Sequence, residues 1–235
     1  SDNWPYLVRQ LAHFAEQHKQ ASGGQKPWLV GHSLGGLLSL MCAARHPELA
    51  RGVVMLDSPV LGGWRASALR VVKRTPLIDR ISPSGVARRR RNAWDDRQAV
   101  FEHFRSKPMF ARWNEQVLHD YVNHGTIDAD GSWQLAFDPE IEARIYATVP
   151  HNLDRLLRKH PLQCPVAFVG GLESVEMRQA GSLDATAEIA GGRVTMIEGS
   201  HLIPMEHPLA VAAAIESHLR VLAKLPEPAD KTKTD

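Results

Sequence analysis

The chain lacks several features that identify specialised classes of protein. Only two of its 235 residues are cysteines, too few for a disulfide framework, so we expect a reducing, cytoplasmic location. The formal net charge is only +2, which argues against a dedicated nucleic-acid-binding protein. No internal repeat is visible. What remains is the composition of an ordinary globular protein.

Long apolar segments and metal-binding spacings are also missing. The longest apolar stretch, Trp28–Ala44, is too short and too interrupted by glycine and serine to span a membrane. His119 and His124 are five residues apart and so do not share a helical face, which argues against a metal site. The sequence therefore predicts neither a membrane span nor a metal or other cofactor. Cys42 and Cys164 are expected to fill small spaces in the core.

One stretch does carry a specific signal, the segment Trp28-Leu29-Val30-Gly31-His32-Ser33-Leu34-Gly35-Gly36. It reads as an apolar strand, a Gly-X-Ser-X-Gly turn and the start of a helix, which is the context of a nucleophile elbow. Gly31 and Gly35 would leave room for Ser33 on a sharp corner. The N–H of Leu34 would then face an oxyanion at the helix N-terminus. The alternative is a glycine-rich turn without chemistry.

The rest of the chain predicts an α/β fold with a mostly parallel sheet. Continuous apolar runs are typical of parallel strands that are buried on both faces, and strand, helix and strand in this order form a right-handed unit. A hydrophobic content of 43% and a charged content of 23% fit one sizeable core. The expected strands after the elbow are Gly52–Asp57, Cys164–Gly170 and Arg193–Glu198, and the expected terminal helices are residues 4–20 and 208–224.

The segment between residues 60 and 161 has a different character, because it is punctuated by prolines and shows little strand signal. We expect a helical cap there, inserted between two parts of a core, residues 1–59 and 162–225. The proline-rich, polar tail 226–235 is expected to be disordered. Candidate cap helices are Ala66–Lys73, Asp96–Phe104 and Pro150–Lys159.

A nucleophilic serine needs a base on a later element. His201 lies in the loop Gly199-Ser200-His201, after the last expected strand and before the last helix, where a base can reach the elbow. His207 is a weaker rival because it stands beside Pro208. His32 is adjacent to Ser33, cannot easily turn back to it, and is expected to pack below the turn.

The carboxylate that would orient His201 has more than one candidate. Asp57 ends the strand after the elbow helix, and Glu173 follows the next strand, so both stand at carboxyl ends of parallel strands. We favour Asp57, with Glu173 and then Glu176 as reserves. Asp57 could instead cap the segment that follows through Ser58 and Pro59.

Together, Gly31-His32-Ser33-Leu34-Gly35-Gly36, Leu56-Asp57-Ser58-Pro59 and Gly199-Ser200-His201 resemble the α/β-hydrolase superfamily from the first helix to the last. The resemblance implies the order serine, acid, histidine, and it matches residues 60–161 to the helical cap of that superfamily. An acid one strand earlier than usual is a variant among its members. Ser33 in the nucleophile position implies acyl chemistry rather than dehalogenation.

One departure from the superfamily concerns the segment before the elbow. Members normally have four strands there, and a loop among them supplies the second N–H of the oxyanion hole. Here only a helix precedes Trp28. We therefore expect the chain to be N-terminally truncated, with the missing strands and the second donor supplied by the rest of a longer chain. Without that donor, activity should be weak.

These observations predict a cofactor-free serine hydrolase that cleaves a carboxylic ester or related acyl bond through Ser33. The alternatives are a perhydrolase or lyase with the same residues, and a ligand-binding protein. The substrate should be a small, apolar acyl compound if the cap aromatic residues line a pocket, although they fit a core equally well. Arg88–Arg91 suggests a solvated face or, less simply, an anionic substrate or docking to a surface. The aromatic residues are Trp64, Trp94, Phe101, Phe104, Phe110 and Trp113.

Overall fold

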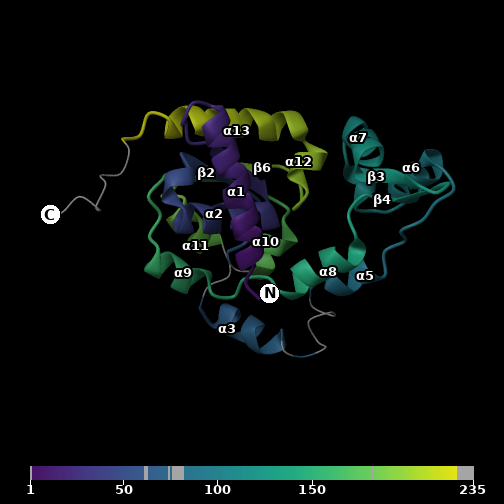
Figure 1. Ribbon diagram of the computed structural model, residues 1–235, viewed down its shortest axis with the longest axis horizontal. Coiled ribbons are helices and arrows are strands. Elements are labelled where there is room, and N and C mark those ends of the chain that lie inside the picture. The colour runs from purple at the N-terminus through teal and green to yellow at the C-terminus, as the bar shows by residue number, and fades with distance from the viewer. Residues whose placement is uncertain (1, 61–62, 74, 76–81, 181–182, 227–235) are drawn as a thin grey trace.

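The computed structural model describes residues 2–60, 63–73, 75, 82–180 and 183–226 of the chain (Figure 1). The predicted disordered tail lies outside the described residues after Pro226. The main body contains α1 (Pro5–Ala21), β1 (Trp28–His32), α2 (Leu34–Arg45), η1 (Pro47–Leu49), β2 (Gly52–Leu56), α9 (Leu153–Lys159), β5 (Val166–Gly171), α10 (Val175–Ala180), α11 (Leu183–Ile189), β6 (Val194–Ile197), α12 (Ile203–Glu206) and α13 (Pro208–Leu222). The segment between β2 and α9 contains α3 (Gly63–Val72), α5 (Ser84–Arg88), α6 (Arg97–Arg105), η2 (Phe110–Arg112), α7 (Glu115–Gly125), β3 (Thr126–Ala129), β4 (Ser132–Leu135) and α8 (Pro139–Ala147).

A parallel sheet forms the centre of the main body. Within the described residues it has four strands in the order β1-β2-β5-β6, which confirms the predicted α/β class. Val54 of β2 lies between Val30 of β1 and Ala167 of β5. β1 ends the sheet, and Val30 there is 41% exposed. The outer edge of β1 is therefore open among the described residues.

Successive residues of each strand point to opposite faces of the sheet, and each face has its own helices. Val53 and Met55 of β2 pack with α1, α2 and α9 in one core cluster. Val54 and Leu56 pack with α12 and α13 in a second cluster. Figure 1 shows α13 and α2 on different sides of the strands. Because helices cover both faces of the sheet, β2 has no exposed residue.

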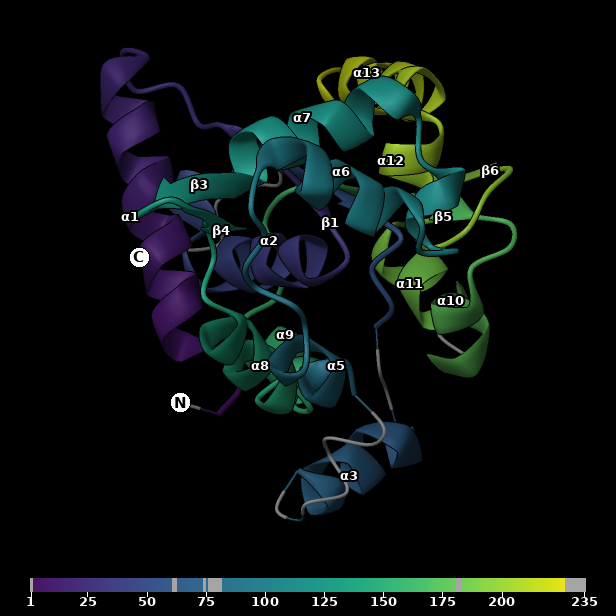
Figure 2. The same ribbon diagram turned by 90° about the vertical axis from the view of Figure 1, so that its right-hand side faces the viewer.

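A second lobe stands beside the sheet and consists of α6, η2, α7, β3 and β4 (Figures 1 and 2). Its core is an aromatic-rich cluster that includes Trp94, Phe101 and Phe104. The hairpin β3–β4 was not predicted, because its strands are only four residues long. Asp130 and Gly131 adopt positive φ angles of 52° and 85° at its turn, the backbone that a tight hairpin needs.

The helix α9 lies just before residue 161, where the sequence places the end of the cap. Leu153 and Leu156 of α9 belong to the core cluster under the sheet, together with Val8 and Leu40. This part of the segment 60–161 therefore packs with the main body, and the division into domains stays a prediction.

Both cysteines are buried in the main-body core, as free thiols. Burial raises the pKa of Cys42 and of Cys164 to about 11. A thiol with so high a pKa is a poor nucleophile at neutral pH. The surroundings fit the predicted space-filling role.

Candidate active site

The elbow between β1 and α2 has the backbone that the motif predicts. Ser33 stands between the last residue of β1 and the first residue of α2, with φ 53° and ψ −117°. Such angles are strained for a residue with a side chain and cost about 1–3 kcal/mol. The N–H of Ser33 donates to the carbonyl of Leu56 at 2.8 Å, which ties the corner to β2.

The glycines around Ser33 differ in how much space they need. A Cβ on Gly31 would lie 2.2 Å from the carbonyl carbon of Gly35, and one on Gly36 would lie 2.0 Å from the hydroxyl oxygen of Ser58. A Cβ on Gly35 would meet nothing within 4 Å. Close packing therefore requires glycine at positions 31 and 36, and the expectation that Gly35 makes room for the corner was wrong.

Asp57 follows β2 directly and is fully buried. Its φ of 42° is again in the left-handed region, and its N–H donates to the carbonyl of Val169 at 2.7 Å. Its Oδ2 accepts the N–H of Gly171 at 2.6 Å, and its Oδ1 accepts the hydroxyl of Ser174 at 2.7 Å. Hydrogen-bond donors therefore hold both oxygens of the carboxylate.

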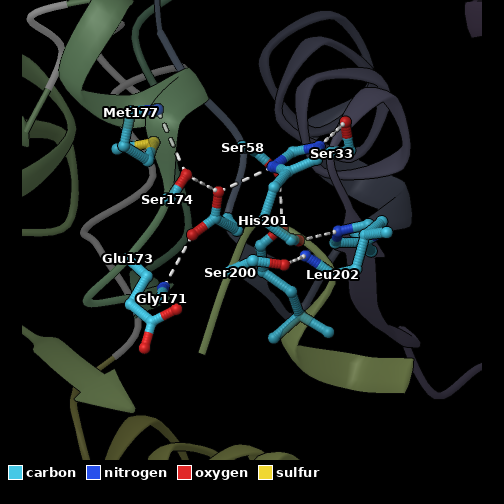
Figure 3. A network of polar contacts seen from close by, with 12 residues as sticks. Ser33, Ser58, Gly171, Glu173, Ser174, Met177, Ser200, His201 and Leu202 are labelled. Carbon is cyan, nitrogen blue, oxygen red and sulfur yellow. Dashed lines mark hydrogen bonds and ion pairs between the residues drawn. The ribbon is translucent and has the colours of Figure 1, made fainter. Parts of the chain in front are cut away.

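His201 connects the two other predicted residues (Figure 3). Its Nδ1 lies 2.7 Å from Oδ1 of Asp57, and its Nε2 lies 2.9 Å from Oγ of Ser33. A carboxylate only accepts hydrogen bonds, so Nδ1–H donates to Asp57 and Nε2 is left to accept the hydroxyl proton of Ser33. Serine, imidazole and carboxylate thus form one hydrogen-bonded chain at the carboxyl ends of parallel strands.

The reserve carboxylates and the rival base lie elsewhere. Oε2 of Glu173 accepts a hydrogen bond from Arg112 at 2.8 Å, and Figure 3 shows the Glu173 side chain directed away from His201. Glu176 is exposed on α10. His207 is exposed and precedes α13 as its N-cap residue. The structure therefore brings Asp57, and none of these three, to the His201 imidazole.

Leu34 is the first residue of α2. The N–H groups of the first helical turn have no acceptor within the helix, so the Leu34 N–H is available to a group beside Ser33.

Contacts that the sequence did not predict hold the loop that carries His201. Oε2 of Glu206 accepts the N–H of Ser200 at 2.8 Å, and its Oε1 accepts the Ser200 hydroxyl at 2.6 Å. The imidazole of His32 reaches the backbone oxygen of His201 at 2.7 Å. Burial lowers the pKa of His32, although the bond to His201 opposes this. No motif encodes these contacts: Glu206 and Ser200 are six residues apart, whereas His32 and His201 are 169 residues apart.

The aromatic residues assigned to the cap pack mainly on one another. Phe104 contacts Phe110 and Tyr121, and Trp113 contacts both of these rings. This arrangement favours the core interpretation over a pocket lining, while the side chain of Trp64 lies outside the described residues.

The arginine run is engaged within its own surroundings. Arg88 pairs with Glu140, and Arg90 pairs with Glu142, so these two guanidinium groups bind acidic residues of α8. Arg91 donates to the carbonyl of Ala93. These contacts favour a structural, solvated face over an anion-binding surface.

Comparison with known proteins agrees with this fold. A family model described as "Alpha/beta hydrolase family" matches residues 1–214. The chain belongs to the alpha/beta hydrolase family. Membership supports hydrolase activity in general. No curated protein matches the chain.

Solved structures of alpha/beta hydrolases are similar to the chain in fold. An E-2-(acetamidomethylene)succinate hydrolase has 21% identity and a TM-score of 0.64, over 91% of this chain and 74% of that one. A peroxisomal alpha-beta-hydrolase from Saccharomyces cerevisiae has 15% identity and a TM-score of 0.67, over 98% of this chain and 65% of that one. An esterase from M. tuberculosis has 20% identity and a TM-score of 0.63, over 91% of this chain and 69% of that one. At such identities the similarity concerns the fold alone, and this alpha/beta hydrolase spans only part of each chain.

The described part of this alpha/beta hydrolase also lacks two features. None of its helices there is both long and apolar enough to cross a bilayer. The same residues contain no group of three or more His, Cys, Asp or Glu side chains arranged to hold a metal ion.

Proposed function

We propose that this alpha/beta hydrolase is a serine hydrolase that cleaves a carboxylic ester or related acyl bond without a cofactor. The observation that carries the proposal is the continuous hydrogen-bonded chain from Ser33 through His201 to Asp57, with distances of 2.9 and 2.7 Å. The strained elbow under Ser33 and the first turn of α2 support it.

In the proposed reaction the Ser33 hydroxyl attacks the acyl carbonyl while Nε2 of His201 takes its proton. Asp57 keeps Nδ1 protonated and stabilises the imidazolium that forms. The Leu34 N–H donates to the oxyanion. His201 then protonates the leaving alcohol, and water, activated by the same Nε2, hydrolyses the acyl-enzyme and regenerates Ser33.

A second oxyanion donor is part of the proposal. We infer that a further segment, pairing with the outer edge of β1, supplies it, since no strand in the described part of the chain pairs with that edge beside the elbow. Loss of one donor costs about 3 kcal/mol of transition-state stabilisation. The chain alone should therefore acylate but turn esters over slowly, and full esterase turnover by the monomeric chain would contradict this inference.

The first experiment is intact-mass labelling with a fluorophosphonate, comparing wild type with Ser33→Ala, Asp57→Asn and Glu176→Gln. We expect one label per wild-type chain, none on Ser33→Ala, slow labelling of Asp57→Asn and wild-type behaviour of Glu176→Gln. Turnover of esters without added peroxide distinguishes a hydrolase from a perhydrolase. Wild-type protein that is folded by circular dichroism and yet unlabelled would refute the proposal.

A further inference from the structure

Arg112 joins the aromatic lobe to both loops around the site. It ends η2, next to Phe110 and Trp113 of the aromatic cluster. Its Nη2 donates to Oε2 of Glu173 at 2.8 Å, and its Nε lies 3.2 Å from Oε1 of Glu206. The hydrogen bond with Glu173, followed by the charge of Glu206, raises the pKa of Arg112.

Glu206 is the more informative of these partners. Its side chain is only 2% exposed, and a buried carboxylate needs a cation or several donors to offset the loss of water. Both of its oxygens hold Ser200, the residue immediately before His201. Arg112 supplies the positive charge for the carboxylate that fixes the base loop.

Glu173 belongs to the loop that holds the acid. Gly171 and Ser174, on either side of it, donate to Asp57. The N–H of Glu173 also donates to the carbonyl of Gly199 at 2.9 Å, so the acid loop and the base loop are already joined there. Arg112 adds a second connection between the two loops, from outside the main body.

A backbone contact reinforces this junction. The N–H of Asn114 donates to the carbonyl of Met205 at 2.8 Å, directly beside Glu206. The side chain of Asn114 accepts the N–H groups of Gln116 and Val117, so the same residue also caps α7. Figure 1 shows the lobe on the side of the sheet where α12 lies.

We propose that Arg112 is a positioning residue, which couples the seating of the aromatic lobe to the geometry of His201 and its loop. The inference rests on the proposed function, since it concerns the same site. With the lobe in place, Arg112 neutralises Glu206 and Glu206 holds Ser200. When Arg112 is removed, the carboxylate loses its cation, the Ser200 loop loosens, and His201 is less often aligned between Asp57 and Ser33.

A surface ion pair would behave differently. Arg112 and Glu173 are about half exposed, and an exposed pair of this kind contributes little to stability. The coupling therefore depends on the buried Glu206, and Glu173→Gln should have a smaller effect than Arg112→Gln.

The test compares Arg112→Gln, Arg112→Lys and Glu173→Gln with Arg144→Gln, which removes an exposed guanidinium paired with Glu140 on α8. Fluorophosphonate labelling of Arg112→Gln should be roughly tenfold slower, the effect expected of a base displaced by a fraction of an ångström. Arg112→Lys should recover part of the rate, because a lysine can still neutralise Glu206. Arg144→Gln should label like wild type.

Hydrogen–deuterium exchange gives a readout that needs no activity. The amides of residues 199–206 should exchange faster in Arg112→Gln than in Arg144→Gln. A labelling rate and exchange equal to those of Arg144→Gln would overturn the proposal. The proposal would also be overturned if Arg112→Gln labels slowly but regains the wild-type rate at a lower temperature at which it is fully folded. That result would indicate a merely structural role for Arg112.

The two proposals fail in different ways. If wild-type protein is not labelled at all, the proposed hydrolase activity fails, and exchange at residues 199–206 still decides whether Arg112 controls the loop. If wild type labels normally and Arg112→Gln matches it in both measurements, only the coupling fails.

Discussion

The imidazole of His32 is hydrogen-bonded to the backbone of His201, with 2.7 Å between Nε2 and the carbonyl oxygen. A carbonyl only accepts, so Nε2 of His32 carries a proton and donates. The two rings lie 4.9 Å apart between centroids. His32, the residue before Ser33, therefore supports the loop that carries His201, a role that the motif did not predict.

Removal of this donor should affect the site more than the fold. We expect His32→Ala to react with a fluorophosphonate about tenfold more slowly than wild type. Its free energy of unfolding in urea should fall by only about 1 kcal/mol, the net value of one hydrogen bond. His207→Ala removes an exposed imidazole from the same region and serves as the control. Equal labelling rates for the two variants would show that the His32 contact does not position His201.

The elbow predicts opposite outcomes for two glycines of one motif. In Gly31→Ala the new methyl would stand 2.2 Å from the Gly35 carbonyl carbon, and we expect a loss of about 3 kcal/mol or more of unfolding free energy. In Gly35→Ala the methyl meets nothing within 4 Å, and a helical alanine gains up to about 1 kcal/mol over glycine. Urea unfolding of both variants measures the difference. Similar stabilities would contradict the steric account.

Stability should fall in mild acid because of buried histidines. Burial lowers the pKa of His32 and of His218 below the ordinary value of 6.5. The unfolded chain then binds protons that the folded chain does not, so the free energy of unfolding decreases as the pH falls through 6.5.

His218→Gln tests this pH dependence, since an amide can still reach Oγ1 of Thr195, which lies 2.9 Å from the imidazole Nε2. We expect the melting temperature of the variant to fall less steeply than that of wild type between about pH 7.5 and about pH 5. His13→Gln, at an exposed position on α1, is the control. An unchanged slope in His218→Gln would contradict the prediction.

The sequence predicted those parts of the site that consecutive residues encode. A strand, a Gly-X-Ser-X-Gly turn and a helix adjoin one another, so Ser33 and Leu34 could be placed without tertiary information. Asp57 could be proposed because strand ends gather at one edge of a parallel sheet. The choice between Asp57 and Glu173 stayed open, since it depends on which way loop side chains turn.

Other contacts of the site join residues that are distant in the chain. His32 and His201 are 169 residues apart, and Asp57 and Ser174 are 117 apart. Arg112 belongs to a lobe whose hairpin was itself missed. No periodicity or motif encodes such pairs, because they arise only when the elements pack.

The contact between Asp57 and Ser174 leads to a last prediction, about where the acid can stand. Their side-chain oxygens are 2.7 Å apart, and Ser174 lies in the loop after β5, where the resemblance to the α/β-hydrolase superfamily implies the more usual acid. A carboxylate at position 174 would therefore have an oxygen close to that of Asp57 and within reach of Nδ1 of His201. A serine at position 57 would then provide the hydroxyl that donates to this carboxylate, as Ser174 does to Asp57 in the present chain.

We expect the labelling rate of Asp57→Ser alone to be lower than that of wild type by a factor of about a thousand or more. Enzymes whose catalytic histidine loses its carboxylate show losses of this order. The double variant Asp57→Ser with Ser174→Asp should regain at least about tenfold of that loss, because the carboxylate again stabilises the imidazolium. Asp57→Ser with Ser174→Asn, which offers an amide of the same size without charge, is the matched control. If both double variants fold and label equally slowly, the carboxylate must lie directly after β2, and the position of Asp57 is a geometric requirement of this site.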